Sequence, residues 1–474
     1  MLSNSRSFKA FFCRILAVVT VAIVFITAFV FAIEGLGWSA DPFLVSSKIT
    51  DAISEGGSSF PAEWAQNTIT GVDTFTDCLT LQISTHKSRK FQESLVSARY
   101  EPGNSEHSCT GLIERLAPDR AGSSVADYWR YWWGSASLLA TVLNIDRFTL
   151  SGYQYSLKVL TYIALGLVGI TSLIRFRSNS LIIIPVVLAL IFGYGIPIFG
   201  QSVAHAPGLL FGLTFCVLYI SVDFLHSSSW RRAICAAILG GISFYFDLLN
   251  GNIVALLILF LTISIMATSQ YKPASRYRAI IETLVLASAC VLGAVYLLIL
   301  RCGLRALVLS LKFSDVMSEW RNALSMRTRN SIPDYNEPYI NIIFIGKRLY
   351  YKFDYAFAPY LNLLEVAQIY FSGVLVFLVC GIWIAKRFWS VGGLPSGPIL
   401  SIMFISGIVP VWFLVLANHT AVHSWMTGRL LSPFFSLSLV LLLLLLKDEL
   451  STRKSNLMLH PQNRKFRGTS SEPS

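Results

Sequence analysis

The chain has 474 residues, of which 54% are hydrophobic and only 14% are charged, and its mean hydropathy is +0.59. A soluble globular protein of this length could not bury so much apolar surface, so that class is excluded. The net charge of +12 is accounted for by membrane topology and anionic lipid headgroups, so no nucleic acid partner is needed.

Apolar segments of about 20 residues recur along the chain, and each matches the roughly 30 Å hydrocarbon core that a helix must cross. We predict an all-α, polytopic membrane protein of about ten transmembrane helices, with a large outer loop between the first and second spans. The predicted spans are residues 11–33, 153–174, 180–198, 206–224, 233–249, 252–269, 279–300, 362–385, 397–417 and 430–446. The third to sixth have short, broken boundaries, because Pro197, Pro207 and the stretch 247–252 interrupt them.

Lysines and arginines near the span ends set the orientation, since cytoplasmic flanks carry the excess of positive charge. Arg6, Lys9 and Arg14 place the N-terminus inside. Counting spans from there puts four further basic turns inside, at Arg175 and Arg177, at Arg231 and Arg232, at Lys272, Arg276 and Arg278, and at Lys386 and Arg387. Both termini are then cytoplasmic. We expect an integral, multi-pass protein of a bacterial inner membrane, although an endoplasmic reticulum protein would have the same topology.

The spans divide the chain into six parts. They are a cytoplasmic stub with the first helix (1–33), an outer loop domain (34–150), helices two to seven (151–300), a second outer loop (301–361), helices eight to ten (362–446) and a polar tail (447–474) that we expect to be disordered. The second outer loop is basic, against the positive-inside trend. An anionic ligand such as a lipid phosphate explains this, and so does a loop whose charge does not affect insertion.

Asp73 and Asp77 lie in the first outer loop, in the segment GVDTFTDCLTLQIST. If residues 75–84 are helical, the two carboxylates lie one turn apart on one face and can share a proton, a cation or a substrate hydroxyl. Apolar neighbours hold them near the membrane, where desolvation raises the basicity of a carboxylate. They are candidate general bases; the alternative is that they cap a helix or face solvent.

Asp247 and His205 lie at span ends. Asp247 ends an apolar span in ISFYFDLLNGN with no cation nearby in the sequence, and ionisable groups at membrane depth usually face a cavity or a partner. The alternative is an aspartate that reaches the interface and caps the next helix. His205, in FGQSVAHAPG, is a weaker candidate, because a lone histidine at a broken span end is more often a hydrogen-bonded structural group.

The segment NHTAVHSWMTGRLL holds the densest group of polar candidates. His419 and His423 are four residues apart and share a helical face. Arg429 opens the last span from the outer side, where its planar guanidinium suits a phosphate, unless it reaches out to lipid headgroups. The histidine pair also has metal-ligand spacing, but it lacks a matching glutamate.

Of the eight cysteines, five lie within predicted spans, where a thiol behaves as a small apolar side chain. Cys78 and Cys109 bracket about 30 residues of the first outer loop, so a disulfide between them is plausible in an oxidising compartment. The spacings show no structural zinc site.

This architecture resembles the GT-C superfamily of integral-membrane glycosyltransferases, the protein mannosyltransferase type included. The shared features are a first span, a large outer loop with acidic residues, many further spans and a later basic outer loop. The segments DTFTDCLTL, YWRYWWGSASLL, FYFDLLNGNIVALL and NHTAVHSWMTGR resemble parts of uncharacterised bacterial multi-pass proteins of this kind.

The resemblance implies transfer of a sugar from a polyprenyl-phosphate donor to a glycan, lipid or protein acceptor at the outer membrane face. Asp77, or else Asp73, would be the base, and Arg429 with the basic loop would hold the lipid phosphate. His419, His423, Asp247 and His205 would join in substrate binding, and Trp129, Trp132 and Trp133 would stack on sugar rings.

The first outer loop lacks the adjacent acidic pair of several branches of that superfamily. The identity of the base and a requirement for Mg²⁺ or Mn²⁺ therefore stay open. A transporter or lipid flippase, and a polysaccharide ligase or polymerase, are the alternative functions. A transporter would also have interrupted spans near charged residues, but the chain shows no internal repeat.

Overall fold

The structure is a computed structural model, and almost all of its regular elements are helices. It describes residues 5–54, 74–86, 90–100, 112, 126–130, 132–176, 182–193, 200–246, 251–271, 276–328, 375–386, 396–416 and 428–465. A single described ribbon pairs β1 (Arg99–Tyr100) with β2 (Ala126–Asp127) in antiparallel register. The predicted all-α class is confirmed.

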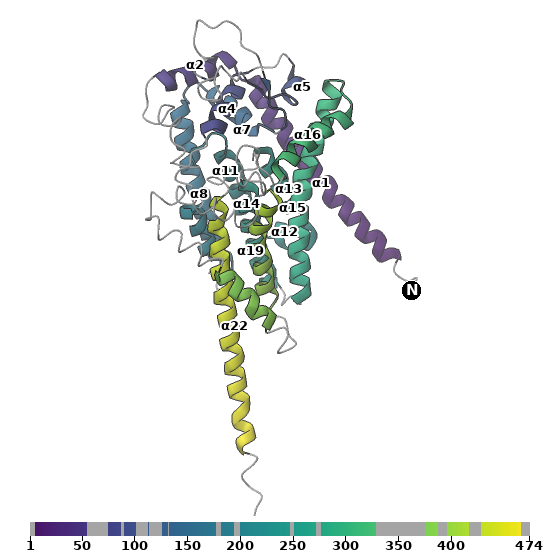
Figure 1. Ribbon diagram of the computed structural model, residues 1–474, viewed down its shortest axis with the longest axis vertical. Helices are drawn as coiled ribbons and strands as arrows, with labels where there is room; N and C mark the ends of the chain where they lie inside the picture. The colour runs from purple at the N-terminus through teal and green to yellow at the C-terminus, as the bar shows by residue number, and fades with distance from the viewer. Residues whose placement is uncertain are drawn as a thin grey trace, which may run out of the picture.

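Short elements between the first two long helices form a layer at one end of the molecule, at the top of Figure 1. We call this the cap layer; it comprises the β1–β2 ribbon, α2 (Pro42–Ser54), α4 (Thr74–Ser84), α5 (Phe91–Ser94) and α7 (Gly134–Leu143). Its core joins Ile49 of α2, Leu81 of α4 and Leu139 of α7 to Leu150, the first residue of α8. The cap layer is thus packed onto the helix bundle by a continuous apolar core.

The bundle is built mainly from long helices. Its elements are α1 (Ser5–Ser39), α8 (Leu150–Phe176), α9 (Ile183–Leu188), η2 (Ala189–Gly193), α11 (Ala206–Ser221), α12 (Asp223–His226), α13 (Ser229–Phe246), α14 (Asn252–Tyr271), α15 (Arg276–Val308), α16 (Phe313–Thr328), the helix Leu375–Lys386, α19 (Gly397–Val415), η3 (Gly428–Leu430) and α22 (Leu431–Lys465). Most helices of the bundle share one large apolar core, while α1 and α16 pack against the bundle through two smaller apolar clusters. Helices α13 and α15 cross closely because Gly240 and Gly293 lack side chains: a Cβ on either would lie 1.9 Å from a carbonyl oxygen of the other helix.

Five helices of the described chain are long and apolar enough to cross a membrane, which makes this an integral membrane protein. They are Val19–Ser39, Leu150–Phe176, Tyr277–Val308, Gly397–Val415 and Leu431–Ser451. Each overlaps a predicted span. Among the other predicted spans, 206–224 and 252–269 correspond to the shorter apolar helices Ala206–Ser221 and Asn252–Thr268.

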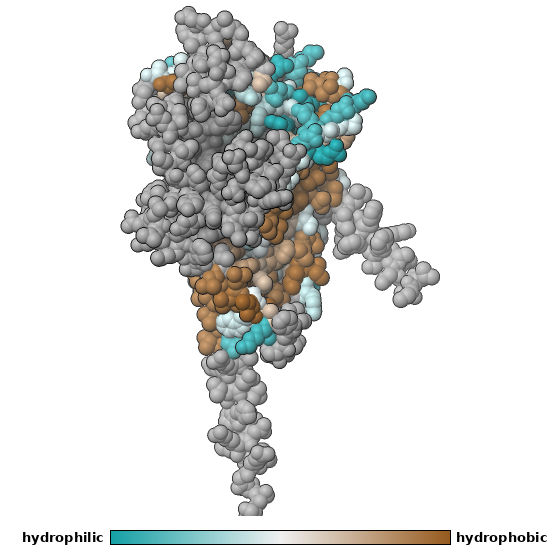
Figure 2. Space-filling view, in the orientation of Figure 1, coloured by the Kyte–Doolittle hydropathy of each residue, from teal (hydrophilic) through white to brown (hydrophobic). Residues whose placement is uncertain are grey.

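Apolar side chains remain exposed along the outside of these helices. Ile163 and Ile174 of α8, Leu292 of α15 and Leu414 of α19 are all more than half exposed. Figure 2 shows the resulting brown zone on the lower part of the bundle, with hydrophilic residues above it. Surface of this kind is stable against lipid and unstable against water.

Ion pairs lie at the end of the bundle away from the cap layer. Arg175, near the end of α8, pairs with Asp223 of α12, and Arg232 of α13 pairs with Glu282 of α15. Arg232 also donates to the backbone oxygen of His226. Arg175 and Arg232 come from two basic turns that the sequence analysis placed on the same side of the membrane.

Two helices run further than the sequence pattern predicted. Helix α15 continues through Arg301 and Arg305 to Val308, because both guanidiniums bond to the cap layer and are not left unpaired. Helix α22 continues to Lys465 through a segment we expected to be disordered. That segment contains several good helix formers, Lys, Glu, Leu and Arg, which can extend a helix without an apolar face.

Candidate functional site

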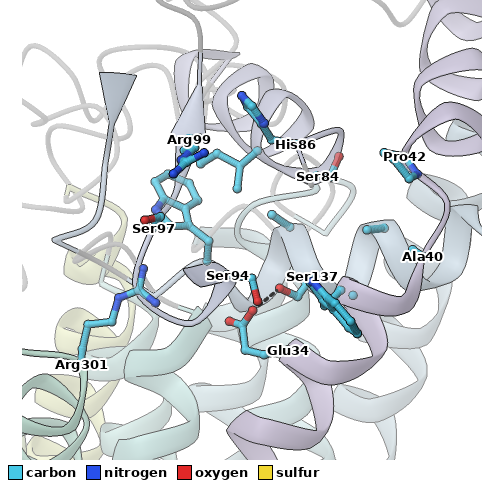
Figure 3. A pocket seen from close by; sticks show the side chains of 16 residues that line it. Glu34, Ala40, Pro42, Ser84, His86, Ser94, Ser97, Arg99, Ser137 and Arg301 are labelled. Carbon is cyan, nitrogen blue, oxygen red and sulfur yellow. Dashed lines mark hydrogen bonds between the residues drawn. The ribbon is translucent and has the colours of Figure 1, made fainter. Parts of the chain in front are cut away.

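A polar pocket opens where the cap layer meets the bundle (Figure 3). Helix α1 contributes Glu34 and Trp38, helix α7 contributes Ser137, and helix α15 contributes Arg301. The remaining lining comes mainly from the cap layer, with His86, Arg99 and three further serines, Ser84, Ser94 and Ser97. The pocket combines charges, hydroxyls and indole rings, which are groups that orient a polar ligand in a site.

Glu34 is the buried carboxylate of this pocket, with only 6% of its surface exposed. The Ser137 hydroxyl donates to Oε2 at 2.7 Å, and the Tyr245 hydroxyl donates to Oε1 at 3.0 Å. The positive charge of Arg301 acts on the same carboxylate. Burying a carboxylate is costly unless hydrogen bonds and an opposite charge compensate it, and Glu34 has both.

Glycines bring the two donors to Glu34. A Cβ on Gly37 of α1 would lie 2.7 Å from the Cα of Ser137, so only glycine lets α7 approach α1 this closely. A Cβ on Gly134 would lie 2.2 Å from the Tyr245 ring. The ring is further held by contacts with Phe29 and Trp132.

Arg301 is buried and fixed by the chain around it. Its Nε donates to the backbone oxygen of Trp129 at 3.2 Å, and a second nitrogen donates to the oxygen of Leu95. Its guanidinium lies over the Trp132 ring, 4.7 Å from the centroid. A cation held this way is pre-organised, since little conformational freedom is lost when a ligand binds.

Arg305, one turn further along α15, attaches the ribbon to the bundle. It donates to Asp127 Oδ2 at 2.7 Å and to the backbone oxygen of Val96 at 2.9 Å. The other oxygen of Asp127 accepts the Ala98 amide at 2.8 Å. The rim of the pocket, which includes Arg99, is thereby fixed to α15.

Asp77 lies in α4, as predicted, but it does not line the pocket. Its Oδ1 accepts the Ser202 hydroxyl at 2.6 Å and the Ala204 amide at 2.8 Å. Ser202 Oγ in turn accepts the backbone amide of His205, the residue before α11. Ser202 thus links Asp77 to the backbone of His205 at the start of α11, where the carboxylate organises the turn.

Two of the three tryptophans predicted to stack on sugars lie in the interior. Trp129 is 2% exposed and lies under Arg305, and Trp132 is 1% exposed and lies under Arg301. Their indole nitrogens donate to Glu319 and to the Leu297 oxygen, respectively. Both therefore support the arginines, and only Trp133 lines the pocket.

Arg429 is buried in η3 at the start of α22, and it does not line this pocket. The other predicted binding residues lie outside the described residues, namely Asp73, Asp247, His419 and His423. Cys78 is disulfide-bonded, and Cys109, its predicted partner, also lies outside the described residues. Cys216, Cys235, Cys290, Cys302 and Cys380 are free and buried.

Neither Glu34 nor Ser137 was predicted to be a site residue, and Arg301 was predicted only to be one of many basic loop residues. The available signal was an acid within the first apolar segment, in FAIEGLGW, where flanking glycines permit close helix approach. Its partners come from α7, α13 and α15, and nothing in the sequence brings these helices together.

The sequence did not decide whether the protein binds a divalent cation. Within the described residues, no group of three or more His, Cys, Asp or Glu side chains is arranged to hold a metal ion. Comparisons with family models, curated proteins and solved structures found no match for the chain.

Proposed function

We propose that this protein is a membrane glycosyltransferase that moves a sugar from a polyprenyl-phosphate donor to an acceptor hydroxyl in the pocket around Glu34. The observation that carries the proposal is a buried carboxylate in a polar pocket, held by two hydroxyl donors and lying within the field of a buried arginine. Fixed acid and base groups of this kind are what proton transfer needs.

Glu34 is the general base in this proposal. A carboxylate has about four acceptor positions, and Ser137 and Tyr245 use one on each oxygen, so a position remains for an acceptor hydroxyl. Asp77, the base expected from the sequence, is engaged at the start of α11 and lies outside the pocket lining. We therefore assign the base to Glu34 and a positioning role to Asp77.

The reaction is a direct displacement. The acceptor oxygen attacks the anomeric carbon while Glu34 takes the hydroxyl proton. The bond between that carbon and the phosphate oxygen breaks, and its electron pair leaves with the polyprenyl phosphate as a stable anion. Arg429 offsets the negative charge that grows on the leaving phosphate. One displacement inverts the anomeric configuration.

The proposed orientation in the membrane follows from the distribution of basic residues. The cap layer faces the outside of a bacterial inner membrane, and the opposite end, where Arg175 and Arg232 form ion pairs, faces the cytoplasm with both termini. Arg429, with His419 and His423, is proposed to hold the lipid phosphate. Acceptors of all three kinds, glycan, lipid and protein, fit this chemistry.

The test is transfer of radiolabelled sugar from a panel of polyprenyl-phosphate sugars by membranes containing wild type or Glu34→Gln. Expression is matched, and folding is checked by gel filtration in detergent. Transfer by wild type and its loss in Glu34→Gln support the proposal. Folded wild-type protein that transfers from none of the donors contradicts it and favours transport or polymer ligation.

A further inference from the structure

The charges around the pocket are unbalanced. Among its lining residues Glu34 is the one acid, while Arg99, Arg301 and His86 can all carry positive charge. Arg301 donates to two backbone oxygens, and its positive charge acts on Glu34. Its charge offsets that of the carboxylate, so the excess positive charge lies with the residues of the cap layer.

Arg99 is the residue that carries this excess. It lies in β1 at the rim of the pocket, its side chain is exposed, and Figure 3 shows it across the pocket from Glu34. Within the described part of the chain its guanidinium forms no ion pair, whereas nearby Arg305 is paired with Asp127. The ribbon holds Arg99 in place, because Asp127, its register partner, is fixed to α15.

The other lining groups match a sugar. The hydroxyls of Ser84 and Ser94 donate to backbone oxygens of Leu81 and Phe91, and their oxygens can still accept hydrogen bonds from a ligand. Trp38 is 36% exposed and offers a partly open indole face. Indole faces and hydroxyls together bind the apolar and polar sides of a sugar ring.

We infer that the acceptor of this pocket is an acidic sugar, whose carboxylate or phosphate binds Arg99 while one of its hydroxyls reaches Glu34. This inference rests on the proposed function for the role of the ligand as acceptor. Arg99, which forms no ion pair within the described residues, can bind such an anion through two parallel hydrogen bonds. The distance between Arg99 and Glu34 then determines which hydroxyl of the acidic sugar receives the transferred sugar.

The test measures binding without any donor, so its outcome does not depend on transfer. Full-length protein in nanodiscs is titrated with glucuronate, glucose 6-phosphate, glucose and inorganic phosphate, with saturation-transfer NMR for the sugars and competition for phosphate. At least one acidic sugar is expected to bind about tenfold more tightly than glucose, and the preferred one identifies the anionic group. Equal binding of all three sugars overturns the inference, and so does inorganic phosphate binding as tightly as the acidic sugar.

Variants test whether Arg99 is the residue that binds the anionic group of the sugar. Arg99→Gln is expected to weaken binding of the acidic sugar about tenfold and to leave glucose binding unchanged. Arg147→Gln, at an exposed arginine that does not line the pocket, is the matched control and should change neither. Glu34→Gln should retain or strengthen binding of the acidic sugar, because it removes the one negative charge of the lining. Unchanged binding in Arg99→Gln, or loss in Arg147→Gln, contradicts the inference.

Discussion

The Ser137 hydroxyl on α7 donates a 2.7 Å hydrogen bond to Oε2 of Glu34 on α1, and so joins the cap layer to the first helix of the bundle. Tyr245 of α13 reaches the other carboxylate oxygen. Three helices far apart in the sequence therefore fix the orientation of one buried carboxylate.

Replacing Ser137 with Ala should lower the rate of transfer about tenfold with little change in KM, because a hydrogen bond to a charged group contributes about 1.5–3 kcal/mol. The measurement is steady-state transfer in detergent with the donor found in the panel. Thr141→Ala is the control, because that hydroxyl donates to the backbone oxygen of Ser137 within α7. Equal rates in wild type and Ser137→Ala would show that this contact does not orient the base.

Gly37→Ala should destabilise the protein by about 1–3 kcal/mol, because the added Cβ would meet the backbone of Ser137. Gly35→Ala, two residues earlier in the same helix, has nothing within 4 Å of its added Cβ and should be neutral or slightly stabilising. Thermal unfolding in one detergent compares the two. A similar Tm for both variants would contradict the close packing of α1 on α7.

Asp77→Ala should reduce stability by about 2–4 kcal/mol, because it removes the acceptor of two buried hydrogen bonds. Asp77→Asn keeps an oxygen acceptor and should lose less. Denaturant unfolding measures both variants. A larger loss of stability in Asp77→Asn than in Asp77→Ala would show that the negative charge, and not the acceptor oxygen, holds the start of α11.

His226 should make stability depend on pH at the end of the bundle away from the cap layer. Burial, with the charges of Arg175 and Arg232, lowers the pKa of His226 below its ordinary value of 6.5. Between the lowered pKa and 6.5 the unfolded state binds more protons. The stability that depends on a neutral His226 is therefore fully present above about pH 6.5. It is lost as the pH falls through the folded-state pKa.

His226→Phe keeps the aromatic contacts with Phe176 and Tyr219 and removes the titration. Its Tm should fall less than that of wild type between pH 7.5 and pH 5. The same fall in both proteins would place the pH dependence elsewhere.

Composition and periodicity were enough to predict helices and several membrane segments, since a run such as 431–446 in α22 is mostly apolar. The membrane segments are local features, because each depends on the free energy of moving a single segment from water into the membrane. A helix at residues 75–84 was considered from the sequence only as a condition for pairing Asp73 with Asp77, and α4 forms there.

The pocket could not be predicted in the same way. Glu34, Ser137, Tyr245 and Arg301 lie on four helices, and their meeting depends on tertiary packing that single-sequence patterns do not encode. The interior placement of Trp129 and Trp132 has the same origin. Arg301 and Arg305 need aromatic faces and backbone oxygens, and the tryptophans supply the faces.

The most direct test of the account compares transfer per folded molecule in Glu34→Gln and Asp77→Asn, with the donor that wild type uses. We predict that Glu34→Gln loses at least about a hundredfold in rate, as expected for removal of a general base, while Asp77→Asn stays within about threefold of wild type. Full activity in Glu34→Gln, with loss in Asp77→Asn, would contradict the account and place the base at the start of α11.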